Sequence, residues 1–76
     1  MAMTQQESVA LVRQILGARD DDELTQIIGL NLGRVDGTFF GVLEASARQL
    51  EREQKPNIAQ ALRAVGDRML RMKTLI

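Results

Sequence analysis

The chain has 76 residues, no cysteine, no histidine and a formal net charge of zero. A chain of this length forms a single domain, residues 1–76, with a marginal core, because it buries only about 60% of the surface that its unfolded form exposes. The missing residue types exclude disulfides, thiolate or imidazole metal sites, the commonest general base and the strongest ordinary nucleophile.

The first predicted helix covers residues 5–16. Thr4 and Glu7 have the spacing of a capping box, in which each side chain accepts a hydrogen bond from the backbone of the other residue. The pattern that follows predicts a buried face with Val9, Val12 and Leu16, flanked by Leu11 and Ile15. Gly17 is the predicted stop, since glycine readily takes the left-handed conformation that ends a helix.

A second, shorter helix is predicted over residues 21–31, with Asp20 as its cap and Glu23 three residues further on. The run Asp20–Glu23 lacks the alternating ligands and the glycine of a calcium loop, so we interpret it as a helix start. Asn31 and Gly33 are the stop signals. The predicted buried stripe consists of Leu24, Ile27, Ile28 and Leu32.

The third predicted helix begins after Asp36 or Thr38, either of which can cap it, and ends near Glu53 or Gln54. Its apolar residues recur at steps of three and four, which places them on one side of a helix. Phe39 widens this apolar side near the start of the helix. The residues with this spacing are Phe40, Leu43, Ala47 and Leu50.

The fourth predicted helix starts at Pro56, because proline disfavours helical geometry in the residue before it and is well suited to the first helical position. A short break around Lys55 predicts an antiparallel hairpin with the third helix. Gly66 lies beside the apolar side of this helix. We therefore expect another helix, the third, to approach Gly66 closely at its own Gly41. The apolar seam of this helix comprises Ile58, Leu62, Val65, Met69, Met72 and Ile76.

The fold class is therefore all-α: a small bundle of about four helices that ends in an antiparallel helical hairpin. There is no secretory signal pattern, and no apolar run approaches the length that a membrane span requires. We accordingly predict a soluble, cytoplasmic chain without a membrane partner. Gly29, Gly33, Gly37 and Gly41 fall four apart, but charged residues interrupt this series, so we interpret these glycines as helix punctuation.

Charge is unevenly distributed along the chain. Residues 1–24 hold two basic and five acidic groups, residues 25–54 hold three and four, and residues 55–76 hold five and one. On the fourth helix Asp67 is spaced to pair with Arg63 and Arg71. This basic segment has neither aromatic residues that could stack on bases nor a recognised nucleic-acid-binding motif. We therefore interpret it as a solvated face rather than a nucleic-acid surface.

Residues of the second half of the chain resemble a known kind of segment. They are Asp36, Phe40, Leu43-Glu44, Ala47, Leu50-Glu51, Ala61 and Leu62-Arg63. In this set the chain resembles a helical-hairpin segment that flanks tetratricopeptide repeats or CHAT domains in large bacterial, mostly cyanobacterial, proteins. It departs from that pattern at Gln54-Lys55-Pro56, where a glycine turn is usual. The resemblance implies an adaptor or packing module rather than an activity.

These observations predict a non-enzymatic module for protein–protein interaction that forms a homo-oligomer, a dimer. The apolar arc of the fourth helix is wider than a coiled-coil stripe, and so small a chain has little core to cover it. We predict no cofactor, metal or catalytic site. Two alternatives stay open, a small-ligand or regulatory protein with a pocket between helices and a nucleic-acid accessory protein that uses Arg63, Arg68, Arg71 and Lys73. The predicted core and interface residues are Phe40, Leu43, Leu50, Leu62, Val65, Met69, Met72 and Ile76.

Overall fold

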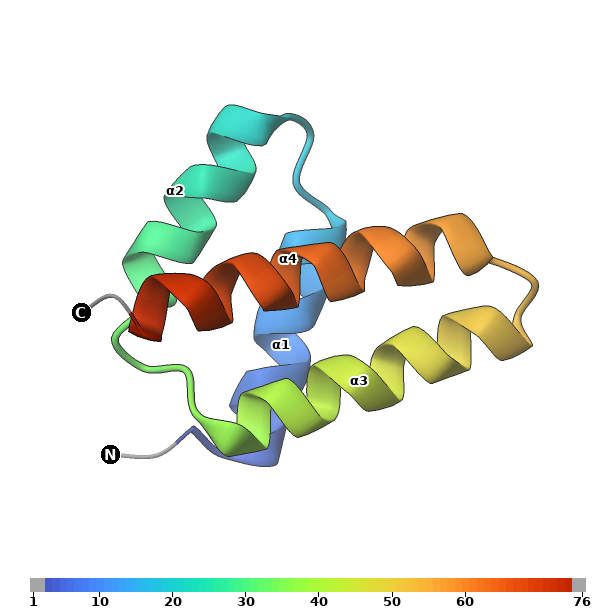
Figure 1. The fold of residues 1–76 in the computed structure, drawn as a ribbon, viewed down its shortest axis with the longest axis horizontal. Coiled ribbons are helices and arrows are strands. Elements are labelled where there is room, and N and C mark those ends of the chain that lie inside the picture. Colours follow the sequence, from blue (N-terminus) through green and yellow to red (C-terminus); the bar gives the residue numbers. More distant parts are fainter. Residues whose placement is uncertain (1–2, 75–76) are drawn as a thin grey trace.

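The structure is a computed structural model that describes residues 3–74 of the chain. It contains four helices joined by short connections, and no strand occurs within those residues. The predicted all-α fold is therefore confirmed (Figure 1). The helices are α1 (Gln5–Leu16), α2 (Asp21–Asn31), α3 (Gly37–Arg52) and α4 (Pro56–Thr74).

Side-chain caps begin the first three helices, which is why their starts were predictable. The Glu7 backbone N–H donates to the Thr4 hydroxyl, and the Thr4 backbone N–H donates to the Glu7 carboxylate, both at 3.0 Å. Asp20 accepts from the backbone of Glu23 at 2.8 Å. Asp36, rather than Thr38, caps α3 and also accepts from the backbone N–H of Met3 at 3.2 Å. One carboxylate thus ties the amino-terminal segment to the start of α3.

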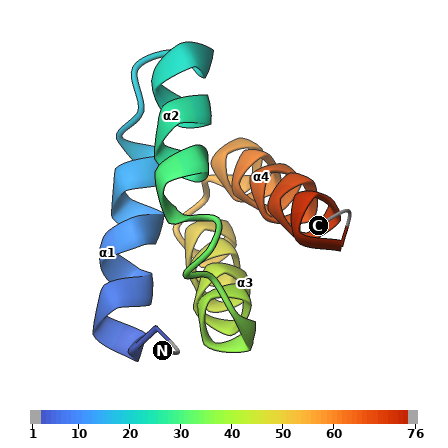
Figure 2. The same ribbon diagram turned by 90° about the vertical axis from the view of Figure 1, so that its left-hand side faces the viewer.

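Helices α3 and α4 pack closely as a hairpin, as predicted. The two helices run antiparallel, and α1 crosses them on one side (Figure 1). Figure 2 shows α1 and α2 next to each other, with α2 extending past the end of α1. The hairpin and α1 therefore enclose the core, while α2 covers one margin of it.

The turn between α3 and α4 closes in a Schellman arrangement without glycine. The Lys55 N–H donates to the Leu50 carbonyl at 2.9 Å, and the Gln54 N–H donates to the Glu51 carbonyl at 3.1 Å. Gln54 has a φ of 65°, the left-handed conformation, whereas no glycine within residues 3–74 has a positive φ. Gly17 ends α1 as predicted, but with a φ of −89° rather than in the left-handed conformation expected of it.

Substitution of Gln54 by glycine is expected to raise the free energy of unfolding by about 1 kcal/mol. A residue with a Cβ is strained by about 1–2 kcal/mol in the left-handed conformation, and part of that gain is offset by the greater freedom of glycine in the unfolded chain. Urea denaturation followed by far-ultraviolet circular dichroism measures the change. The matched control is Gln60→Gly on the exposed side of α4, which should lose about 1 kcal/mol. If both substitutions lowered the free energy of unfolding by similar amounts, the left-handed conformation assigned to Gln54 would be wrong.

The core is aliphatic apart from one phenylalanine, Phe39, which is completely buried. Every helix contributes to it. Within residues 3–74 the only buried polar side chain is that of Ser8, whose hydroxyl donates to the Thr4 carbonyl at 2.9 Å. The buried hydrophobic residues are Met3, Leu11, Val12, Ile15, Ile28, Val35, Phe39, Leu43, Ala47, Ala59, Leu62 and Met69.

Three helices turn a slightly different face inward from the one predicted. In α3 the fully buried side chain is Phe39, and Phe40 is only partly buried. In α4 Ala59 is buried and Ile58 is 44% exposed, and in α1 Leu16 is 42% exposed. The small residues of α4 let it approach α3 closely, so this helix packs on a line shifted from its most hydrophobic residues.

The close approach predicted at Gly66 is present, but its partner differs from the one predicted. A Cβ atom placed on Gly66 would lie 3.0 and 3.2 Å from the two methyl groups of Leu43. Nothing lies within 4 Å of the corresponding position on Gly41. The pairing of Gly66 with Gly41 is therefore wrong, and the space left by the missing side chain is filled by Leu43.

Candidate interaction surface

The predicted core and interface residues occupy the core and its margin. Leu43, Leu62 and Met69 are buried, and Ile76 lies outside the described residues. The other four pack against the core while remaining partly accessible; they are Phe40, Leu50, Val65 and Met72. The α3–α4 contact thus absorbs most of the apolar seam of α4.

Apolar side chains that remain exposed lie at other positions. Leu16, Leu30, Ile58 and Leu70 are exposed by 42%, 74%, 44% and 51%. Leu30 stands outside the grooves of the surface, whereas the other three line them. Leu16 and Ile58 share one groove, Leu70 lies in a second, and Leu16 also borders a third between α1 and α3. Isolated exposed leucines are common on protein surfaces, whereas exposed residues that share a groove are typical of an interaction site.

The first groove, which we name the α1/α2/α4 groove, has a volume of about 300 Å³ and is almost entirely apolar. Its buried residues Ile15 and Leu62 form the floor, and its exposed residues Leu16 and Ile58 form the rim. Asn57 is its only polar residue. The complete lining is Ile15, Leu16, Leu24, Asn57, Ile58, Ala61, Leu62 and Val65.

Opposite charges flank the α1/α2/α4 groove. On one side is the start of α2, with four successive carboxylates at Asp20–Glu23. Glu23 pairs with Arg19 at 3.7 Å and Asp21 with Arg68 at 3.8 Å. This leaves the exposed Asp22 as the charge of this flank best placed to meet a partner. On the other side is the start of α4, which has Lys55 before it and no acidic residue in its first turn. The partial positive charge at the amino end of a helix adds to that of Lys55 at the start of α4. At the start of α2 the carboxylates outweigh the same partial charge, so that end is electronegative.

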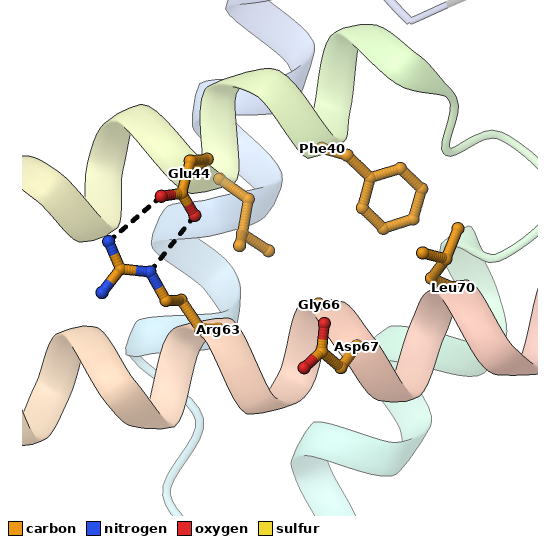
Figure 3. Close-up of a pocket in the computed structure, with 7 residues that line it drawn as sticks. Phe40, Glu44, Arg63, Gly66, Asp67 and Leu70 are labelled. Carbon is orange, nitrogen blue, oxygen red and sulfur yellow. Dashed lines mark hydrogen bonds and ion pairs between the residues drawn. The ribbon is translucent and has the colours of Figure 1, made fainter.

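The second groove, the α3/α4 groove, has a volume of about 250 Å³ and a more polar lining. Figure 3 shows Phe40 and Leu70 at one end of it and the ion pair of Arg63 with Glu44 at the other. The guanidinium of Arg63 donates to Glu44 at 3.1 and 3.2 Å and to Glu51 at 2.9 and 3.1 Å. The strongest polar groups of this groove are thus already bound to one another.

Arg63 controls the ionisation of its two neighbours. The hydrogen bonds that it donates hold the pKa of the Glu44 and Glu51 carboxyls below the ordinary value. The same bonds, first that to Glu51 and then that to Glu44, raise the pKa of Arg63. The three groups are therefore charged together at neutral pH and link α3 to α4.

Acid is expected to destabilise the chain in part through this cluster. Since the pKa values of Glu44 and Glu51 are lowered in the folded state, their contribution is fully present above about 4.5 and is lost as the pH falls below it. Arg63→Met should therefore reduce the difference in Tm between pH 7 and about pH 3, measured by circular dichroism. Arg48→Met is the comparison variant and should have a smaller effect, because Arg48 pairs with Glu44 at 3.4 Å but ranks below Arg63 among the causes that lower the pKa of Glu44 and Glu51. An unchanged difference in Arg63→Met would contradict this role.

The ion pairing of α4 differs from the predicted one. Arg63 binds the carboxylates of α3 and not Asp67, because the guanidinium reaches across the hairpin. Arg68 lies 3.4 Å from the Thr25 hydroxyl and 3.8 Å from the Asp21 carboxylate. Lys73 donates to the Val35 carbonyl at 2.7 Å. Three of the five cations in residues 55–74 are thus held by other parts of the molecule.

Residues 3–74 contain no group of three or more acidic residues placed to hold a metal ion. In the same part of the chain, each helix is too short or too polar to cross a membrane. No family model, no curated protein and no solved structure matches the chain. The resemblance to hairpin segments beside tetratricopeptide-repeat and CHAT domains therefore stays a prediction.

Proposed function

We propose that the chain is a non-enzymatic, cytoplasmic module for protein–protein interaction that self-associates as a dimer. The observation that carries the proposal is the α1/α2/α4 groove, where the exposed side chains of Leu16 and Ile58 border an aliphatic recess. Helical proteins commonly bind a partner by placing apolar side chains into such a recess. Burying apolar surface there removes it from water and favours association.

The two alternative functions have less support. A small-ligand site is favoured by an enclosed cavity with unsatisfied polar groups, whereas the α3/α4 groove holds polar groups that already bind one another. A nucleic-acid surface needs cations that are free to meet phosphates. Arg63, Arg68 and Lys73 instead donate within the molecule.

Sedimentation equilibrium of the whole chain over the micromolar range tests the proposal. We expect the mass to rise with concentration from 8.5 kDa toward twice that value. A constant mass of 8.5 kDa up to the highest concentration would contradict self-association. Fluorescence anisotropy with a labelled DNA duplex at low salt separates the nucleic-acid alternative, which predicts binding that weakens steeply as salt is added.

A further inference from the structure

We infer that the α1/α2/α4 groove is the surface that receives the second copy, in a twofold arrangement that inserts Ile58 of each copy into the groove of the other. The inference rests on the proposed function and specifies the surface and contacts through which it acts. Its support comes from the shape of the groove and from the charges beside it.

The shape of the groove suits pairing with itself. A twofold interface uses the same patch on both subunits, so the patch must contain both a projection and a recess. Ile58 projects from the first turn of α4 and is 44% exposed, while Leu62, one turn further along the same helix, is 1% exposed on the floor. An aliphatic side chain from a second copy therefore meets an aliphatic lining of similar character.

The charges beside the groove complement themselves under the same symmetry. The carboxylates at the start of α2 lie on one flank and Lys55, with the positive end of α4, on the other. A twofold axis through the groove brings the acidic flank of each copy toward the basic flank of its partner. An unrelated partner needs its own matching pair of charges, whereas a second copy necessarily carries it.

The α3/α4 groove is less suited to this role. Burying it would remove Arg63 and Glu44 from water although their hydrogen bonds are already made within the chain. Leu70 is the only large apolar residue on its rim that is more than half exposed. The α1/α2/α4 groove offers two exposed aliphatic residues without that desolvation cost.

The first experiment compares two exposed apolar residues by sedimentation equilibrium. Ile58→Asp should weaken self-association at least 100-fold, because each interface buries two copies of the new carboxylate in an aliphatic recess. Leu30→Asp, at a residue 74% exposed and outside both grooves, should leave it unchanged. Circular dichroism verifies that both variants fold. A dimer that Ile58→Asp does not weaken would overturn the inference and leave the proposed function intact, whereas a monomeric wild type would contradict both.

The second experiment reverses exposed charges, which keeps the core intact even if Ile58→Asp fails to fold. Lys55→Glu and Asp22→Lys each place like charges opposite one another in a homodimer, so each variant alone should associate about tenfold more weakly. An equimolar mixture of the two restores opposite charges at both contacts and should associate as tightly as the wild type. A mixture that associates no more tightly than its components would overturn the arrangement.

Discussion

Phe39→Ala is expected to lower the free energy of unfolding by about 3–5 kcal/mol, the usual cost of removing a fully buried phenylalanine. Phe39 is 0% exposed and is among the largest side chains of the core. Because a domain of this size is stabilised by only about 5–10 kcal/mol, the variant should lose about a third or more of its stability. Urea denaturation followed by circular dichroism at 222 nm measures the loss, since the chain has no tryptophan or tyrosine.

Phe40→Ala is the matched control for that prediction. Its ring contacts that of Phe39 edge to face, with centroids 5.4 Å apart, but it is only partly buried on the side of the α3/α4 groove. We expect a loss of about 1–2 kcal/mol, from the aromatic contact and the partial burial. Losses of equal size, or a larger loss for Phe40→Ala, would mean that α3 turns the originally predicted face toward the core.

Gly66→Val is expected to lower the free energy of unfolding by about 2–3 kcal/mol, because the new side chain would overpack the contact of α4 with α3. Even a single Cβ atom would approach the methyl groups of Leu43 to 3.0 Å, and valine adds two further methyl groups. Leu43 is 4% exposed, so its freedom to move aside is small. The same urea titration measures this effect.

Gly41→Ala is the control for the glycine substitution and should change stability in the opposite direction. Nothing lies within 4 Å of the position where its Cβ would be, and alanine is favoured over glycine by about 1 kcal/mol within a helix. A gain of about 1 kcal/mol is therefore expected. If both variants changed stability in the same direction, the close approach of the two helices at Gly66 would be wrong.

The limits of the helices were predictable because local chemistry determines them. Thr4, Asp20 and Asp36 each accept a hydrogen bond from the first turn that follows them, and all three had been singled out as possible caps. Pro56 is the first residue of α4, a position that the fixed φ of its ring favours. These interactions span only a few residues, so a linear pattern contains all the information that they require.

The rotation of each helix about its axis depended on contacts that no local pattern contains. Phe39 and Phe40 are adjacent and equally apolar, so helical spacing alone does not decide which of them points inward. The choice depends on how α3 packs against the other helices: Phe39 is buried in the core, whereas Phe40 lines the α3/α4 groove. For the same reason the exposed position of Ile58 was not predicted.

The ion pairs and the groove required knowledge of distant elements. Asp67 is four residues from Arg63 along α4, yet the guanidinium binds Glu44 and Glu51 across the hairpin. The α1/α2/α4 groove combines residues from three helices, and its existence depends on where α2 lies relative to α4. Ile58, Leu62 and Val65 were recognised as apolar, but their role as one wall of a recess was not.

Because α2 makes few buried contacts with the core, the two walls of the α1/α2/α4 groove differ in stiffness. α2 contributes one buried side chain, Ile28, whereas α4 is locked into the core along its length by Ala59, Leu62 and Met69. Elements with few buried contacts open at lower free energy than the rest of a protein. The α2 side is therefore the compliant one. In the dimer that we propose, it would adjust its distance from α4 to the second copy, at the entropic cost of restricting its own motion.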